Sequence, residues 1–236
     1  MSAHLLIRAV GPGATLQDGG RRGYLRFGVS EAGPMDWIAH GRANILAGNA
    51  EGAGAIEVGL GGIELQAGGG EVCLGYAGGA FTVTLNGQSL PGAGRIRLGA
   101  DDRLAVRPGA TGAWFYLSPA GGLAVAPVMG SLSTSLRSGI GGLNGRALAA
   151  GDRLALRGSP ALPELGFEER TSARSSPIRV LLGPQDDYFS ADGIRSFFTA
   201  SYRVKSIFQS GSKLVIDISG KITGEKPIDD SSYVSR

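Results

Sequence analysis

Short runs of apolar residues bounded by glycine recur along most of the chain. Runs of this length that are rich in Val, Ile, Leu and aromatic residues are typical of β-strands. The pattern therefore predicts a mainly β chain with a few short helices. The predicted strands cover residues 4–10, 55–60, 62–67, 71–76, 81–85, 103–107, 113–117, 153–157, 178–182 and 213–218.

One of these runs ends in a strong turn signal. Asn86-Gly87 directly follows residues 81–85. Asn-Gly is the favoured two-residue loop of a β-hairpin, because both central residues must adopt positive φ. A hairpin is therefore expected at this point.

Two segments have helical spacing instead. The first covers residues 34–47: Pro34 suits the first helical turn, where its missing N–H costs nothing, and Gly48 stands where a left-handed C-terminal cap belongs. The second covers residues 191–200, with Ser190 as its N-cap. The face of the first helix that we expect to be buried holds Met35, Ile38, Arg42, Ile45 and Leu46.

The chain also shows a division along its length. Residues 158–177 are rich in Ser, Pro and charge and contain few aliphatic residues, which is typical of a linker. We therefore predict an N-terminal β-rich domain at 1–158, a linker or crossover at 159–177 and a second region at 178–236. Within the first domain, residues 99–107 resemble residues 149–157, either as two independent turn-then-strand units or as a weak internal repeat.

The glycine content is the most unusual feature of the composition. The chain has 41 glycines in 236 residues, whereas an average content of about 7% would give about 17. No three-residue period is present, which excludes collagen. The glycines separate short apolar runs, as expected where many tight turns need positive φ.

Charge and cysteine content exclude several classes. The formal net charge is +3, and the arginines are dispersed, so neither a nucleic-acid nor a membrane-binding patch is indicated. Cys73 is the single cysteine and excludes an intrachain disulfide; its apolar surroundings in the sequence predict a buried thiol. No run has the length of a transmembrane helix, and residues 1–10 are too short and polar for a signal peptide, so we expect a cytoplasmic protein.

Polar residues able to orient a substrate are dense between residues 11 and 57. An Arg in this group can hold a carboxylate through two hydrogen bonds, and an Asp can act as a base where its environment raises its pKa. The alternative is structural, with Asp36 capping the first helix and Asp18 and Asn49 bonding to turn backbone. The candidates are Gln17, Asp18, Arg21, Asp36, Asn44, Asn49 and Glu57.

A second candidate cluster joins hydroxyl residues to a glycine-rich loop. Such a loop can bind an anion through backbone N–H groups, although the Gly-Lys-Ser/Thr ending of a P-loop is absent. The alternative is an ordinary loop. The residues concerned are Ser131, Ser133, Thr134, Gly141, Gly142 and Arg146. With only two histidines and one cysteine, a structural zinc site or Cys-His catalysis is not indicated, and His40 is expected at the helix surface.

Four ordered motifs between residues 5 and 189 resemble one family, that of KipA, allophanate hydrolase subunit 2 and the C-type subunit of 5-oxoprolinase, also called the biotin-dependent carboxyltransferase domain. They are residues 15–23 (Thr-Leu-Gln-Asp-Gly-Gly-Arg-Arg-Gly), residues 33–36 (Gly-Pro-Met-Asp) with 43–44, 48–49 and Glu57, residues 141–146 with Leu148 and 151–152, and residues 183–185 with Asp187 and Phe189.

The resemblance implies a cyclophilin-like β-barrel and work within a complex. The partners would be a KipI-type subunit, which is the B-type subunit of 5-oxoprolinase, and a LamB/YcsF-type subunit, which is its A-type subunit. That complex opens 5-oxo-L-proline to L-glutamate with ATP, so ATP would act through the complex. Of the second barrel half, residues 178–236 would contain only the beginning, because the later motifs of the family do not occur in the chain.

The same resemblance suggests roles for the candidate residues. Gln17, Asp18, Arg21 and Asp36 are expected close to the reacting amide. Two alternative functions remain open: biotin-dependent carboxyl transfer to a urea-type substrate, with the biotin on another protein, and a non-enzymatic KipA-like regulator. The residues expected to bind or support the substrate are Asn44, Asn49, Glu57, Ser133, Thr134, Gly141, Gly142 and Arg146.

Overall fold

The computed structural model describes residues 3–158, 181–184, 186–200, 203–210, 213–219 and 233–235. The chain divides into two compact units, Met1–Glu169 and Arg170–Arg236. This division falls within residues 159–177, where the linker is predicted, but residues 159–180 lie outside the described residues, so the linker itself stays a prediction.

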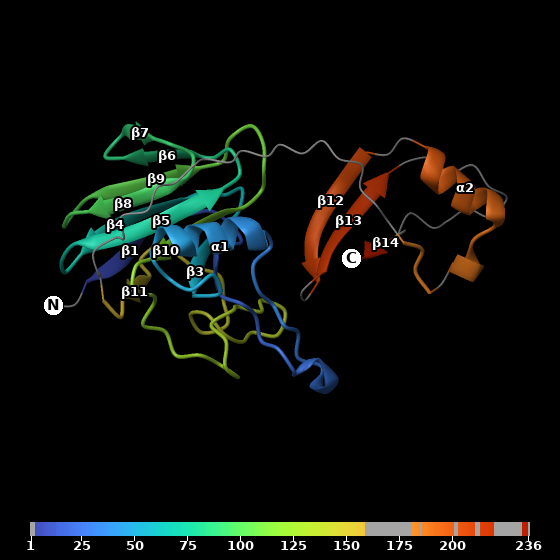
Figure 1. Ribbon diagram of the computed structural model, residues 1–236, viewed down its shortest axis with the longest axis horizontal. Coiled ribbons are helices and arrows are strands. Elements are labelled where there is room, and N and C mark those ends of the chain that lie inside the picture. The colour runs from blue at the N-terminus through green and yellow to red at the C-terminus, as the bar shows by residue number, and fades with distance from the viewer. Residues whose placement is uncertain are drawn as a thin grey trace. The chain divides into compact units, whose positions relative to one another are not determined.

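The first unit is built from two antiparallel sheets (Figure 1). The six-stranded sheet has the order β11-β1-β4-β9-β6-β7 and the five-stranded sheet the order β2-β3-β10-β5-β8. The strands are β1 (His4–Val10), β2 (Thr15–Gln17), β3 (Ala55–Val58), β4 (Ile63–Gly68), β5 (Val72–Gly78), β6 (Thr82–Leu85), β7 (Gln88–Leu90), β8 (Gly94–Leu98), β9 (Arg103–Arg107), β10 (Phe115–Pro119) and β11 (Arg153–Ala155).

The main apolar core draws on both sheets. Leu5 and Leu65 of the six-stranded sheet belong to the same buried cluster as Leu16, Ile56 and Leu117 of the five-stranded sheet. The mainly β prediction is therefore confirmed. Among the described strands the two sheets stay separate and do not close into one barrel, which is where the structure differs from the expected barrel.

Helix α1 (Trp37–Leu46) covers the other face of the five-stranded sheet. Strand side chains alternate between faces, so Phe115 and Leu117 enter the main core while Tyr116 packs beneath α1. The helix comes very close to β5: a Cβ on Gly75 would lie 2.2 Å from the carbonyl oxygen of Ala43. Only glycine permits this approach, so Gly75 fixes the position of α1 on the sheet.

This close approach overturns the predicted burial of α1. Small residues such as Ala39 and Ala43 are buried, whereas Ile38 is 81% exposed and Ile45 is also exposed. His40, expected at the surface, is instead buried against the sheet. The predicted face is therefore right for Leu46, which is buried, and wrong for Ile38 and Ile45, because small residues take the positions where the helix backbone approaches β5.

Several local predictions are confirmed. Asn86 and Gly87 both have positive φ, and Leu85 pairs with Gln88 across the predicted hairpin. Gly48 is left-handed after α1, and Cys73 is buried. The two similar segments, 99–107 and 149–157, form matching turns in which an aspartate, Asp102 or Asp152, accepts a bond from the backbone N–H three residues earlier.

The second unit contains a short 3-10 helix η2 (Asp186–Tyr188), helix α2 (Ala191–Thr199) and a three-stranded antiparallel sheet. Ser190 caps α2 by accepting from the Gly193 N–H, as predicted. The sheet consists of β12 (Arg203–Ser210), β13 (Lys213–Ser219) and β14 (Tyr233–Ser235). The strand predicted at 178–182 is not found at Leu181 and Leu182, and residues 178–180 lie outside the described part. None of the helices in the described residues is long and apolar enough to cross a membrane.

Candidate functional site

A row of polar side chains crosses three neighbouring strands beneath the start of α1. Thr15 of β2 and Tyr116 of β10 are both directly opposite Glu57 of β3. The Tyr116 hydroxyl donates to Oε2 of Glu57 over 2.8 Å, and the Thr15 hydroxyl lies 3.4 Å from Oε1. Gln17 joins the row by donating from Nε2 to the Thr15 hydroxyl.

This row holds the Gly-Pro-Met-Asp segment at residues 33–36. The N–H of Gly33 donates to Oε1 of Gln17, the N–H of Met35 to Oε2 of Glu57, and the N–H of Asp36 to the Tyr116 hydroxyl. Proline at 34 has no N–H, so each backbone donor of the segment ends on a side chain of the sheet. Asp36 then caps α1 by accepting from the Ala39 N–H.

Asp18 follows β2 and is surrounded by donors. Its Oδ1 accepts from the hydroxyls of Ser131 and Ser133 and from the Gly20 N–H, and its Oδ2 accepts from the Leu132 N–H at 2.6 Å. Partial burial acts to raise the pKa of Asp18, but the bonds from Ser131, Ser133, Leu132 and Gly20 together outweigh it and lower that pKa. Asp18 is thus held as a carboxylate and is a poor base.

Arg21 is the largest fully buried side chain among the described residues, with 1% of its surface exposed. Its Nε donates to the carbonyl oxygen of Val128 and its Nη2 to that of Ser133. Nη1 is buried without a hydrogen-bond partner. Burial lowers the pKa of Arg21, and the charge of Asp18 acts in the opposite direction. An enclosed guanidinium whose Nη1 has no partner is suited to an anionic or carbonyl oxygen.

Burial has the opposite consequence at Glu57. The side chain is 2% exposed, and desolvation raises its pKa to about 7, against the bonds from Met35, Tyr116 and Thr15. The same desolvation, together with the charge of Glu57, raises the pKa of Tyr116 well above its usual value. Glu57 is therefore the carboxyl group of this network that can change protonation near neutral pH.

Three further residues tie α1 to this network. His40 lies with Nε2 3.3 Å from the Gln17 carbonyl oxygen and its ring edge-on to Tyr116; burial lowers its pKa. Asn44 donates to the carbonyl oxygens of Glu51 and Ala53, and Asn49 donates to Ser118 and Pro119 on β10. These contacts position the helix on the sheet.

The glycine-rich loop covers the Asp18 side of the network. Gly141 and Gly142 have positive φ, and a Cβ on either would lie 2.0 Å from an oxygen of Ser133 or Thr134. The Gly142 N–H donates to Leu132, and the Gly145 N–H donates to Gly141. These two N–H groups are thus used within the chain and are not available to a phosphate, and we derive no step through ATP on this chain.

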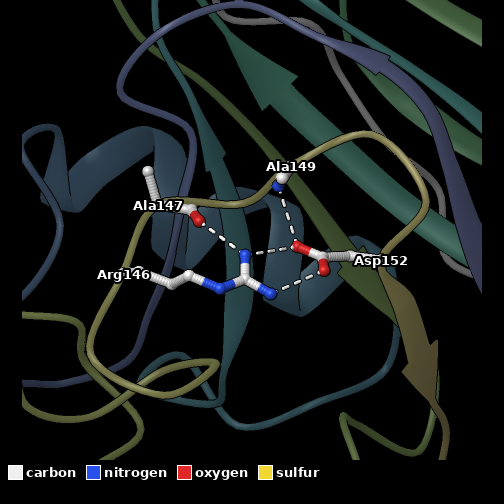
Figure 2. A network of polar contacts seen from close by, with 4 residues as sticks. All are labelled: Arg146, Ala147, Ala149 and Asp152. Carbon is white, nitrogen blue, oxygen red and sulfur yellow. Dashed lines mark hydrogen bonds and ion pairs between the residues drawn. The ribbon is translucent and has the colours of Figure 1, made fainter.

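Arg146 lies at the surface, in a two-bond ion pair with Asp152 (Figure 2). Its Nη1 and Nη2 donate to the two carboxylate oxygens over 2.8 and 2.7 Å, and Nη1 also donates to the Ala147 carbonyl oxygen. The hydrogen bond with Asp152 raises the pKa of Arg146 and lowers that of Asp152. The hydrogen bonds given for Arg146 are to residues of its own turn and do not connect it to the other candidate residues.

The hydrogen bonds therefore connect most residues selected from the sequence. Gln17 links the row around Glu57 to the hydroxyl segment around Asp18, because its Nε2 also donates to the Thr134 carbonyl oxygen. Most of the network is buried, and Asp18, Asp36 and Asn49 are its partly exposed members. Sequence reasoning did not select Thr15, His40, Tyr116 or Ser118 as site residues; only the β-strand alternation around Tyr116 could have pointed to one of them.

Comparison with known proteins fits this architecture. Residues 27–234 match the family model of the carboxyltransferase domain, subdomain A and B. The chain belongs to this carboxyltransferase-domain family. It is 34% identical over 203 residues to the C-type subunit of 5-oxoprolinase from Escherichia coli, covering 85% of the chain and 64% of that protein. It is 32% identical over 210 residues to urea amidolyase of Saccharomyces cerevisiae, covering 82% of the chain and 11% of that protein.

Solved structures of the carboxyltransferase-domain family agree. The chain superimposes on the crystal structure of TTHA0988 with a TM-score of 0.80 and 31% sequence identity, covering 93% of the chain and 43% of that structure. The chain spans less than two thirds of the length of the E. coli relative described above. The resemblance inferred from the four sequence motifs is confirmed by these matches.

Proposed function

We propose that this carboxyltransferase-domain chain acts as the C-type subunit of a 5-oxoprolinase-type complex, which hydrolyses 5-oxo-L-proline to L-glutamate with ATP. The observation that supports this most is the 34% identity to the E. coli C-type subunit of 5-oxoprolinase over 85% of the chain. We propose a KipI-type and a LamB/YcsF-type subunit as its partners, with ATP acting through the complex.

The network suggests roles for the site residues in this reaction. The buried N–H of Arg21 without a partner is suited to an oxygen of the substrate, where a charged donor is most effective away from water. Asp18 keeps a negative charge beside Arg21 and orders the 131–133 segment that supplies an acceptor to it. Asp36 is the partly exposed carboxylate at the start of α1, where a substrate N–H can be bound.

Reconstitution tests the proposal. The three subunits, purified separately and combined, are expected to form glutamate from 5-oxo-L-proline only when ATP and this chain are both present. A complex that turns over equally fast without this chain would overturn the proposal. Bovine serum albumin in place of the chain serves as the protein control.

Carboxyl transfer is the second candidate function, supported by the 32% identity to urea amidolyase. Under it, carboxybiotin on a separate carrier and urea would replace ATP and 5-oxo-L-proline. Carboxybiotin consumption that depends on urea and on this chain, with no glutamate formed from 5-oxo-L-proline, would select this function.

A further inference from the structure

The hydrogen bonds to Glu57 favour its carboxylate form, whereas burial and the nearby charge of Asp36 favour its protonated form. Thr15 accepts from Gln17 Nε2, which leaves the Thr15 proton directed to Glu57 Oε1. Tyr116 accepts from the Asp36 N–H, which likewise leaves its proton for Glu57 Oε2. Together with the Met35 N–H, three donors point to the Glu57 carboxyl group, and this arrangement favours its ionised form.

The charges near Glu57 oppose this pattern. No Lys or Arg forms an ion pair with Glu57 within the described ranges. The titratable groups that face it are Tyr116 from β10, Asp36 from the start of α1, and His40 of α1 behind the Tyr116 ring. Asp36 adds negative charge, while burial keeps His40 neutral. The carboxylate is therefore stabilised by hydrogen bonds alone, in a nearly dry position.

The bonds made by Glu57 also have a geometric consequence. The Met35 N–H binds Glu57 itself and the Asp36 N–H binds Tyr116, the donor to Glu57, while Gly33 is held separately by Gln17, so two of the three bonds to the segment involve Glu57 or its direct partner. A hydrogen bond to a carboxylate is roughly twice as strong as one to a neutral acceptor. Protonation of Glu57 would therefore weaken the bond from Met35 directly and the bond from Asp36 through the Tyr116 hydroxyl.

We propose that Glu57 and Tyr116 are positioning residues which, through the proton on Glu57, set how firmly the Gly33–Asp36 segment is held and where the Asp36 carboxylate stands at the start of α1. The step from this clamp to turnover rests on the function proposed above. The clamp itself is a property of the chain alone and is tested without any partner protein.

The test is a pH titration of backbone amides by NMR on the full chain. The amide shifts of Met35 and Asp36 are expected to move together with one midpoint near neutral pH, and their hydrogen-exchange protection to fall roughly tenfold on the acid side. Glu57→Gln should abolish the titration at both amides. Glu64→Gln, a strand glutamate paired with Arg107 in the other sheet, is the matched control and should leave it intact.

Tyr116→Phe gives a second, independent result. Removing the hydroxyl takes one donor from the carboxylate form of Glu57, so the midpoint at Met35 should move to higher pH, and the Asp36 amide should lose protection at every pH. Amides of residues 35 and 36 that do not titrate near neutral pH, or that titrate alike in Glu57→Gln, would overturn the proposal. Inactivity of the reconstituted wild-type complex would instead count against the proposed function and leave the amide result standing.

Discussion

The Tyr116 hydroxyl donates to Oε2 of Glu57 over 2.8 Å, from the position directly opposite on the neighbouring strand. Both side chains point away from the core between the sheets and toward α1. This cross-strand pair holds the segment before α1, because Glu57 accepts from the Met35 N–H and Tyr116 accepts from the Asp36 N–H. Burial raises the pKa of the Glu57 carboxyl group to about 7, so its protonation changes near neutral pH.

Glu57→Gln is expected to change how stability depends on pH. The folded-state pKa of Glu57 is raised from its usual 4.5 to about 7. The stabilisation gained by binding this proton is therefore fully present below pH 4.5 and is lost as pH rises through 7. The free energy of unfolding of the wild type, relative to Glu57→Gln, should fall by about 3 kcal/mol between pH 4.5 and pH 8. Urea unfolding at several pH values measures this.

The control for that experiment is again Glu64→Gln. Its carboxylate forms a surface ion pair with Arg107, and such pairs contribute about 1 kcal/mol or less. A difference between wild type and Glu57→Gln that stays constant from pH 4.5 to 8 would show that Glu57 ionises in the folded chain as it does in the unfolded one.

Asp18→Asn should destabilise the chain, because the amide nitrogen cannot accept bonds. With the amide nitrogen in the place of Oδ2, the Leu132 N–H loses its acceptor; with the amide in the other orientation, the three donors to Oδ1 lose theirs. The expected loss is about 3 kcal/mol at pH 7, measured by urea unfolding. The lowered pKa of Asp18 adds a pH signature: its contribution is present above pH 3.8 and is lost as pH falls through the lower folded-state value.

A turn aspartate elsewhere in the first unit provides the comparison. Asp102 is partly exposed, its bonds lie at the surface, and it also accepts a backbone N–H, from Gly99. Asp102→Asn should cost clearly less than Asp18→Asn, because water can replace the lost bond. Equal losses would mean that the bonds around Asp18 contribute no more than those of an ordinary surface turn.

Gly142→Ala tests whether the glycine loop is fixed by contact with the hydroxyl segment. Gly142 and Gly139 both have positive φ, so alanine costs about 1 kcal/mol at either position. A Cβ at 142 would lie 2.0 Å from the Thr134 hydroxyl oxygen, whereas a Cβ at 139 meets nothing within 4 Å. Gly142→Ala should therefore lose at least about 2 kcal/mol more than Gly139→Ala in thermal or urea unfolding. Similar losses would argue against the tight packing.

The sequence predicted the elements that depend on local signals. The Asn86-Gly87 hairpin and the Ser190 cap follow from short-range backbone chemistry, and both are present. The buried face of α1 was predicted only in part, with Leu46 right and Ile38 and Ile45 wrong, since it depends on Gly75, a residue of β5 that lets the helix backbone approach the sheet closely. No periodicity within α1 records that contact.

The same distinction applies to the site. Gln17, Asp18 and Arg21 stood out because polar residues were dense in one stretch of sequence. Tyr116 did not stand out, because its position opposite Glu57 depends on the pairing of β10 with β3, about sixty positions apart in the chain. The ion pair of Arg146 with Asp152 was likewise not predicted, although both residues belong to one sequence motif, because it depends on the turn that brings the two side chains together.

The most direct test of the proposed site is turnover of 5-oxo-L-proline by the reconstituted complex carrying Arg21→Lys. Lysine keeps the charge but cannot reach both carbonyl acceptors and still offer a planar donor to the substrate. The expected result is a fall of about 100-fold in kcat/KM with the variant chain still folded by circular dichroism. Arg107→Lys, at a surface ion pair, should stay within about twofold of wild type. A folded Arg21→Lys chain that supports wild-type turnover would contradict the assignment of this buried arginine to the substrate.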